Sequence, residues 1–111
     1  LPLYELVAYR VSREWNYNGN CAVVVGATYP AELARVRAIV GNMPILIPGV
    51  GAQGGTLQDV VPAGKTTDGR GMIINASRSV IFASKGADFA EAAANEVRNM
   101  NQTIRPLSQA A

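Results

Sequence analysis

Three short, uncharged apolar runs constrain the fold of this chain more than any other feature of its sequence. They lie at 21–25, 44–47 and 71–74. None shows the alternation of a strand with one wet face, so they are typical of strands buried on both faces, as in parallel sheets. Amphipathic stretches precede, separate and follow them, at 3–15, 31–40, 56–61 and 88–106. Strands that alternate with helices join in parallel through right-handed crossovers, so this order predicts an α/β fold.

The helical stretches carry their apolar residues at helical spacing. In the first stretch every fourth residue is apolar, at Leu3, Val7, Val11 and Trp15. We expect this stripe to face the protein interior, with Trp15 packed in it. The second stretch places Arg37 away from its apolar residues, on the polar side. We expect Pro62 and Pro106 to end the helices before them, because proline lacks the N–H group that continues a helix.

The composition excludes several classes of function. The 111 residues include ten Lys and Arg against eight Asp and Glu, and a net charge of +2 is too small for an electrostatic nucleic-acid footprint. There is no histidine and a single cysteine, Cys21, which excludes disulfides within the chain, cysteine-based zinc sites and histidine triads. No apolar run approaches the ~20 residues that cross a bilayer. We therefore expect no metal, no nucleic acid and no membrane partner.

The number of strands is small for an independent domain. Parallel strands need cover on both faces, and this chain offers few helices to provide it. The first helix follows no strand, and the sequence begins at Leu1 rather than at a methionine. These features predict the C-terminal part of a larger α/β domain.

A glycine-rich segment, Pro-Gly-Val-Gly-Ala-Gln-Gly-Gly, directly follows the second run at 48–55. Its glycines allow sharp turns that expose backbone N–H groups to an anion, so Gly51, Gln53 and Gly54 are candidate binding residues. The segment also matches G-x-G-x-x-G, the fingerprint of dinucleotide-binding folds. That alternative is disfavoured, because a short helix follows the segment and the next strand ends at Asn75 with no Asp or Glu to hold a ribose.

The loop after the third run is a second candidate for anion binding. Ser77 and Ser79 are candidate N-caps of the following helix, and N–H groups at a helix start attract negative charge. Arg78 adds a fork of donors that suits a phosphate, whereas a positive charge at a helix start is otherwise unfavourable. In (β/α)8 barrels the loops after strands 7 and 8 often hold a phosphate. The three runs are therefore interpreted as strands 6 to 8 of such a barrel, preceded by the helix of unit 5.

Three segments, at 25–33, 48–55 and 73–81, resemble the orotidine 5′-phosphate decarboxylase family, including the decarboxylase domains of bifunctional enzymes that make uridine monophosphate. The resemblance implies a cytoplasmic, homodimeric (β/α)8-barrel enzyme of pyrimidine biosynthesis that binds orotidine and uridine monophosphate and uses no metal or organic cofactor. By the same resemblance, Gln53 and Arg78 contact the substrate phosphate. The N–H groups of Ser77 and Arg78 complete the phosphate cup, and Pro48 lies near the base.

The family's catalytic pattern, Asp-x-Lys-x-x-Asp, has no match in this chain, and the two lysines, Lys65 and Lys85, are expected in loops. Residues 1–111 are therefore interpreted as a C-terminal fragment of the decarboxylase domain, holding the phosphate-binding half of the site and inactive alone. We expect such a fragment to self-associate through its free strand edges. Two alternatives stay open: another phosphate-binding barrel acting on a sugar or indole phosphate, and a small stand-alone phosphate- or nucleotide-binding module.

Overall fold

The chain folds into alternating strands and helices, which confirms the predicted α/β class. The computed structural model describes residues 1–51 and 55–110. In chain order its elements are α1 (Leu3–Arg10), a π-helical turn η1 (Val11–Trp15), β1 (Val23–Val24), α2 (Pro30–Val40), β2 (Ile45–Ile47), α3 (Leu57–Gly64), β3 (Met72–Ile74), α4 (Arg78–Ile81) and α5 (Phe89–Gln109). Each predicted strand is present but shorter than its apolar run.

The strands form one parallel sheet in the order β1-β2-β3. One row across the sheet joins Val24, Leu46 and Ile73, and the row before it joins Val23, Ile45 and Met72. Successive side chains of a strand point to opposite faces, so these two rows face different sides of the sheet.

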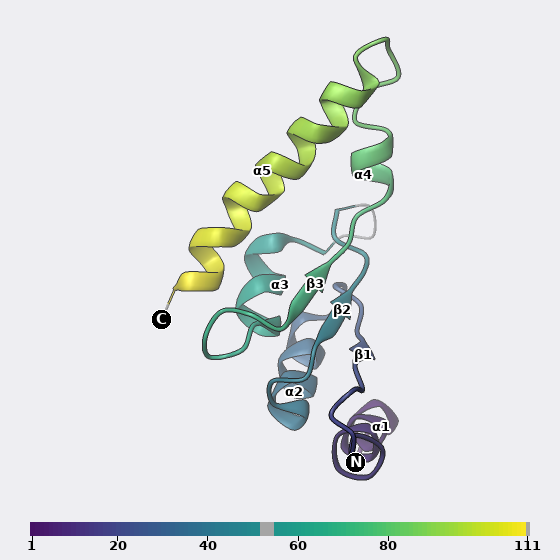
Figure 1. Cartoon of the computed structure of the whole chain (residues 1–111), viewed down its shortest axis with the longest axis vertical. Helices are drawn as coiled ribbons and strands as arrows, with labels where there is room; N and C mark the ends of the chain where they lie inside the picture. The colour runs from purple at the N-terminus through teal and green to yellow at the C-terminus, as the bar shows by residue number, and fades with distance from the viewer. Residues whose placement is uncertain (52–54, 111) are drawn as a thin grey trace.

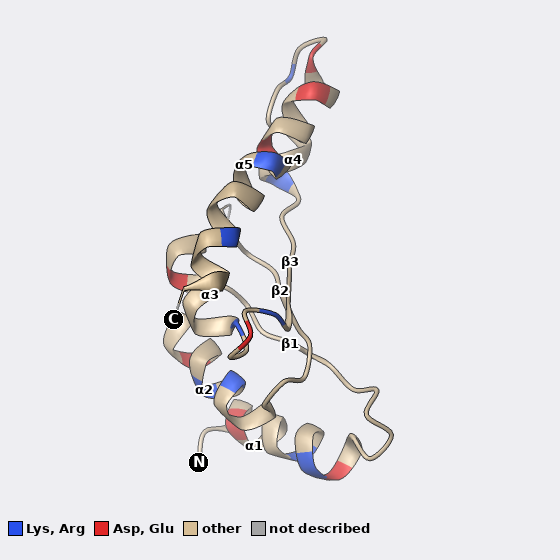
Figure 2. Ribbon diagram, turned by 60° about the vertical axis from the view of Figure 1, so that its left-hand side comes forward, with Lys and Arg blue, Asp and Glu red and all other residues tan. Residues whose placement is uncertain are grey.

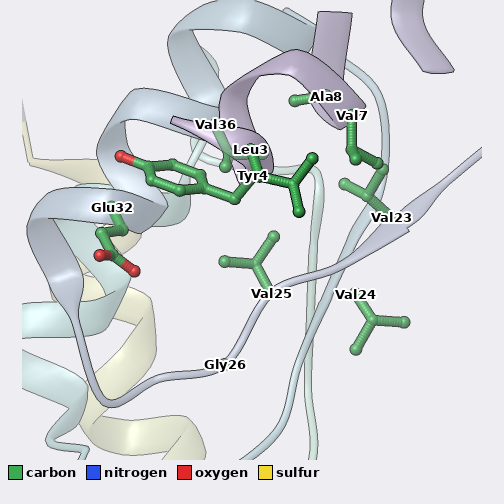
Figure 3. A pocket seen from close by; sticks show the side chains of 10 residues that line it. All are labelled: Leu3, Tyr4, Val7, Ala8, Val23, Val24, Val25, Gly26, Glu32 and Val36. Carbon is green, nitrogen blue, oxygen red and sulfur yellow. The ribbon is translucent and has the colours of Figure 1, made fainter. Parts of the chain in front are cut away.

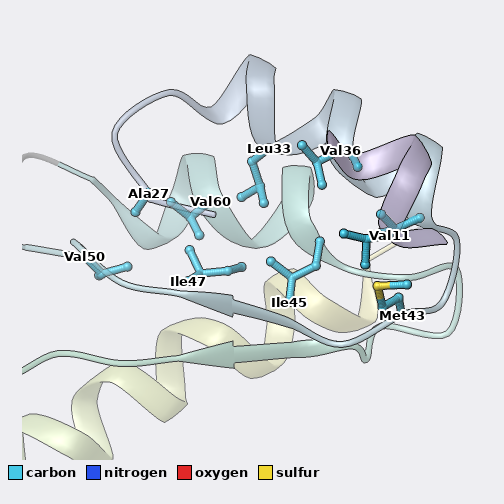
Figure 4. Close-up of a cluster of buried hydrophobic side chains, with 11 residues drawn as sticks. Val11, Ala27, Leu33, Val36, Met43, Ile45, Ile47, Val50 and Val60 are labelled. Atoms are coloured by element: carbon cyan, nitrogen blue, oxygen red, sulfur yellow. The ribbon is translucent and has the colours of Figure 1, made fainter. Parts of the chain in front are cut away.

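The helices cover only one face of the sheet. α2 packs beside α3, α1 lies beside α2, and α5 lies beside α3 (Figure 1). Under this layer are the largest fully buried side chains, at Leu33, Ile45, Ile47, Val60 and Val61. All of these except Val61 belong to the cluster in Figure 4. On the other face no helix of the described residues covers the strands (Figure 2), and Val24 and Ile73 are 67% and 58% exposed. A single helical layer over a parallel sheet is consistent with part of a barrel wall.

Arg37 is buried, which contradicts its expected position on the polar side of α2. Its guanidinium donates four hydrogen bonds of 2.6–2.8 Å to the backbone carbonyls of Gly41, Met43, Gly64 and Gly71. The carbonyls of Gly41 and Gly64 lie at the C-terminal ends of α2 and α3, and those of Met43 and Gly71 precede β2 and β3. A long side chain can reach such a cluster from beside an apolar stripe, and the hydrogen bonds compensate for its desolvation.

The first helix does not bury its stripe as expected. Val11 is buried, but Leu3, Val7 and Trp15 are 74%, 45% and 57% exposed. The side of α1 that packs on α2 instead carries Glu5 and Ala8, which are buried. Trp15 ends the π-helical turn, and the change of helical pitch after Arg10 shifts the last positions of the stripe out of line.

Neither Pro62 nor Pro106 ends its helix, so both predicted ends are wrong. Each proline removes one N–H group that would bond to the carbonyl four residues earlier, at Gln58 and Gln102. All four residues are exposed, so water can satisfy those carbonyls and the helices continue.

The C-terminal end of α5 is held by the loop before β3. Lys65 follows α3, and its Nζ donates hydrogen bonds to the carbonyls of Leu107, at 3.2 Å, and of Ala110. The predicted loop position of Lys65 is thus confirmed, and its ammonium satisfies carbonyls that a helix end leaves free.

Candidate functional site

A pocket of about 170 Å³ lies where β2 and β3 end. It is lined by residues 48–50 after β2 and by residues 75–78 after β3. The register pairs Ile47 with Ile74, so Pro48 and Asn75 leave the sheet side by side at the same edge. The structure therefore brings together Pro48, Ser77 and Arg78, as expected of loops at the carboxyl ends of parallel strands.

Ser77 and Arg78 begin a single helical turn beside the pocket. The N–H groups of Ile81 and Phe82 donate to the carbonyls of Ser77 and Arg78 at 2.8 and 2.9 Å, which holds the turn in place. Ser77 is the N-cap residue, as predicted, although its hydroxyl makes no capping hydrogen bond. Ser79, the other candidate N-cap, lies inside α4. The hydroxyl of Ser77 and the guanidinium of Arg78 are exposed, and among the described residues neither group has a hydrogen-bond partner.

The described glycines that follow β2 lie close to residues after β1 and to α4. Gly49 and Gly51 have φ values of 94° and 85°, a region that side chains disfavour. The N–H of Gly51 donates to the carbonyl of Gly55 at 2.8 Å. Gly51 lies next to Ser79 of α4, and Gly55 packs so closely on Ala27 that a Cβ atom at Gly55 would lie 2.5 Å from the Cβ of Ala27. Gln53 and Gly54, two of the predicted binding residues, lie outside the described residues.

Positive charge at the pocket comes from Arg78. It is the one charged side chain among the described residues that line the cavity. The strands themselves carry no Lys, Arg, Asp or Glu (Figure 2). A small cavity with backbone groups, hydroxyl and amide side chains and one guanidinium suits an anion such as a phosphate.

Asn75 also lines the pocket, and it was not among the predicted binding residues. Its carboxamide can both donate and accept hydrogen bonds, and it is exposed at the mouth of the pocket. One signal could have identified it. Asn75 is the first residue after β3, at the strand end where ligands of parallel α/β proteins bind.

In the described part of the chain, no three His, Cys, Asp or Glu side chains lie close enough together to hold a metal ion. Within residues 1–51 and 55–110, no helix combines the length and the apolar character that spanning a membrane requires.

No family model matches the chain. Several curated relatives do match the chain. A protein named orotidine 5′-phosphate decarboxylase from Azoarcus sp. (strain BH72) is 58% identical over 91 residues, which are 82% of this chain and 34% of the relative. The protein of the same name from Cupriavidus taiwanensis is 54% identical over 103 residues, which are 93% of this chain and 38% of the relative. The chain thus spans little more than a third of the length of these relatives.

Solved structures agree with the curated relatives. The chain superimposes on Leishmania donovani OMP decarboxylase with a TM-score of 0.76 and 42% identity, covering 94% of this chain and 39% of that one. The corresponding values for Leishmania donovani UMP synthase are 0.76 and 46%, covering 92% and 22%.

The one-sided helical layer and the pocket at the strand ends define an α/β protein whose parallel sheet is consistent with part of a (β/α)8 barrel wall. The chain is homologous over most of its length to the orotidine 5′-phosphate decarboxylases, which confirms the resemblance of its three segments.

Proposed function

We propose that this chain forms the phosphate-binding part of an orotidine 5′-phosphate decarboxylase, which converts orotidine 5′-phosphate to uridine 5′-phosphate and carbon dioxide. The observation that carries the proposal is the pocket at the ends of β2 and β3, with Arg78 as the charged side chain among its described lining residues. The names of the relatives, at 58% and 54% identity, supply the reaction and the substrate.

Each binding residue has a distinct part in the proposal. The guanidinium of Arg78 neutralises the phosphate and donates two hydrogen bonds to it, while the N–H groups of Ser77 and Arg78 bind its remaining oxygens. Gly51 and Gly54 let the backbone approach the phosphate closely, and the amide of Gln53 reaches it from the same loop. Pro48 contacts the base from the end of β2.

Phosphate binding also contributes to catalysis in this proposal. Binding energy from a group remote from the reacting carbon can be used to orient and desolvate the substrate carboxylate. Loss of carbon dioxide leaves a carbanion that a protonated lysine must neutralise. The lysine and aspartates of the family pattern lie on strands other than β1, β2 and β3, so this chain alone is inactive.

The position of the chain in the barrel follows from the same proposal. β1, β2 and β3 are strands 6, 7 and 8 of the complete domain, and α1 is the helix of unit 5. The complete enzyme is a homodimer with no metal or organic cofactor.

A chimera tests the proposal directly. In it, the matching part of this chain replaces the 91 matched residues of the Azoarcus relative. We expect the chimera to decarboxylate orotidine 5′-phosphate. Its Arg78→Ala variant should lose about tenfold to a hundredfold in kcat/KM, since a hydrogen bond to a charged group contributes ~1.5–3 kcal/mol.

The matched control is Arg10→Ala. Arg10 is also an arginine with an exposed side chain, but it pairs with Glu14 on the first helix and does not line the pocket. We expect it to leave kcat/KM unchanged. An active chimera in which Arg78→Ala behaves like Arg10→Ala would show that the phosphate binds elsewhere.

A further inference from the structure

The connection between η1 and β1 contains an asparagine that is followed by glycine, Asn18 before Gly19. Every other asparagine of the sequence precedes a residue that has a side chain. The peptide nitrogen after an asparagine can attack the carboxamide of that asparagine. A β carbon on the following residue hinders this approach, and glycine has none. Asn18 is therefore the asparagine of this chain that is most open to attack from its own backbone.

The surroundings of Asn18 leave room for this reaction. Asn18 and Gly19 are both exposed, and the connection projects from the rest of the molecule between α1 and β1 (Figure 2). The φ of Gly19 is 69°, and a Cβ atom placed on it would meet no heavy atom within 4 Å. The space beside Gly19 is thus open for a ring that includes its peptide nitrogen.

One hydrogen bond of a surface turn holds the nitrogen of Gly19. Its N–H donates to the carbonyl of Asn16 at 3.0 Å. Exposed turns open locally at a much smaller free-energy cost than the core does, so this bond delays the attack without preventing it. The carboxamide of Asn16, in contrast, is engaged, because its oxygen accepts a hydrogen bond from the N–H of Cys21 at 2.9 Å.

Neither large cavity near the sheet includes this connection. The apolar groove of about 670 Å³ between α1, β1 and α2 (Figure 3) has none of residues 16–20 in its lining. The pocket at the ends of β2 and β3 has none of them either. Residues 16–20 lead into the start of β1, whereas that pocket lies where the strands end. A reaction at Asn18 is therefore separate from the proposed phosphate site.

We propose that Asn18 is a site of spontaneous deamidation, in which the peptide nitrogen of Gly19 displaces ammonia from the side-chain carboxamide. The nitrogen bonds to Cγ of Asn18 and closes a succinimide ring. The bond from Cγ to the carboxamide nitrogen breaks, and the proton of the peptide N–H leaves with the ammonia.

Water then opens the ring. It adds to one of the two ring carbonyls, whose bond to the ring nitrogen breaks, and the nitrogen regains a proton. Opening at Cγ leaves an aspartate at position 18. Opening at the backbone carbonyl leaves an isoaspartate, in which the chain runs through the former side chain. Both products add a carboxylate, so the net charge of the chain falls by one unit from +2.

Incubation of the chain at mildly alkaline pH tests the proposal. Cation-exchange chromatography separates the product, because it has gained a negative charge. Mass spectrometry of proteolytic peptides locates the modified residue, and enzymatic methylation of the free α-carboxyl group measures the isoaspartate. We expect conversion at Asn18 to be about tenfold or more faster than at any asparagine that precedes a residue with a β carbon.

Asn42 is the matched control within the same molecule. It is also exposed, and the N–H of the residue after it, Met43, also donates to a carbonyl of a turn, that of Val40 at 3.3 Å. The two sites differ in the residue that follows the asparagine, which is glycine at one and a buried methionine at the other. Equal rates at Asn18 and Asn42 would overturn the proposal.

A synthetic peptide of residues 14–22 gives the rate in the absence of the fold. We expect Asn18 of the folded chain to react within about tenfold of the peptide, because the turn that holds Gly19 opens easily. Circular dichroism checks that the chain stays folded during the incubation. A larger difference would mean that the hydrogen bond to Asn16 protects the site, and would overturn the proposal.

Asn18→Ser removes the carboxamide at an exposed position, so the chain should fold as before. We expect the early acidic species to disappear in this variant. Its persistence would show that the new charge arises at another residue, against the proposal. These measurements involve no nucleotide, so their outcome is independent of the proposed function.

Discussion

Arg37 joins the two connections that lead into β2 and β3. Its four hydrogen bonds reach carbonyls at the ends of α2 and α3 and at the residues just before the two strands. Burial lowers the pKa of this guanidinium, because desolvation disfavours its charged form, yet arginine stays charged in proteins. The side chain therefore replaces backbone hydrogen bonds that neither helix nor sheet provides at this place.

We predict that Arg37→Met lowers the free energy of unfolding by about 3 kcal/mol, because buried carbonyls lose their partner. Chemical denaturation followed by circular dichroism measures the change. Arg10→Met is the matched control; its exposed ion pair with Glu14 should contribute less than about 1 kcal/mol. Similar losses in both variants would mean that the carbonyls find other partners.

Glu5 and Arg35 form the charged contact between α1 and α2. The guanidinium donates to the two carboxylate oxygens of Glu5 at 3.2 and 2.9 Å, and the side chain of Glu5 is 8% exposed. The hydrogen bonds from Arg35 lower the pKa of Glu5 below its ordinary value of 4.5. In the unfolded chain the carboxyl regains that ordinary value.

The pair therefore makes stability depend on pH. A carboxyl whose pKa is lower in the folded state contributes stability above its unfolded pKa and loses it as pH falls through the folded pKa. We predict that the free energy of unfolding falls as pH drops below 4.5, and that Glu5→Gln makes this fall smaller. Denaturation curves between pH 7 and pH 3 measure it. A pH dependence of Glu5→Gln that equals that of the unsubstituted chain would contradict the assignment to Glu5.

Among the connecting segments, the turn after β2 depends on one close contact. A Cβ atom at Gly55 would lie 2.5 Å from the Cβ of Ala27 and 3.1 Å from the carbonyl oxygen of Gly49. Both neighbours belong to segments that leave the sheet next to the pocket. A methyl group at Gly55 would push the glycine-rich turn away from the end of β1.

We predict that Gly55→Ala destabilises the chain by about 1–3 kcal/mol, the usual cost of overpacking. In the chimera it should also raise the KM for orotidine 5′-phosphate. The control is Gly26→Ala, where a Cβ atom meets nothing within 4 Å. Equal stability and equal KM for the two alanine variants would show that a methyl group at Gly55 fits beside Ala27, which would contradict this prediction.

The order and type of the helices and strands were predictable, because they depend on local patterns. The apolar runs located all three strands, and helical spacing located α1, α2 and α5. Arg37 was misplaced because its partners come from segments up to 34 residues away in the sequence. The helix ends at Pro62 and Pro106 were misplaced because solvent exposure, which a local pattern does not reveal, decides whether a proline ends a helix.

At the scale of the whole molecule, the position of the pocket was predictable from the parallel order of the strands. Strands that run in parallel end at one edge, so the loops after β2 and β3 had to meet, and Pro48, Ser77 and Arg78 lie there. Asn75 was missed because an amide side chain has no distinctive spacing or charge. The exposed stripe of α1 was misjudged for a different reason. Apolar spacing predicts that a face is covered, without saying which segment covers it.

The cluster around Arg37 and the pocket around Arg78 occupy opposite ends of the same strands. Met43 and Gly71 precede β2 and β3, whereas Pro48 and Asn75 follow them. Arg37 holds the strand starts together, whereas Arg78 is exposed and lines the pocket proposed to bind phosphate. Substitutions at Ser77 and Arg78 can therefore change the proposed anion specificity of the pocket without breaking the Arg37 hydrogen bonds before β2 and β3.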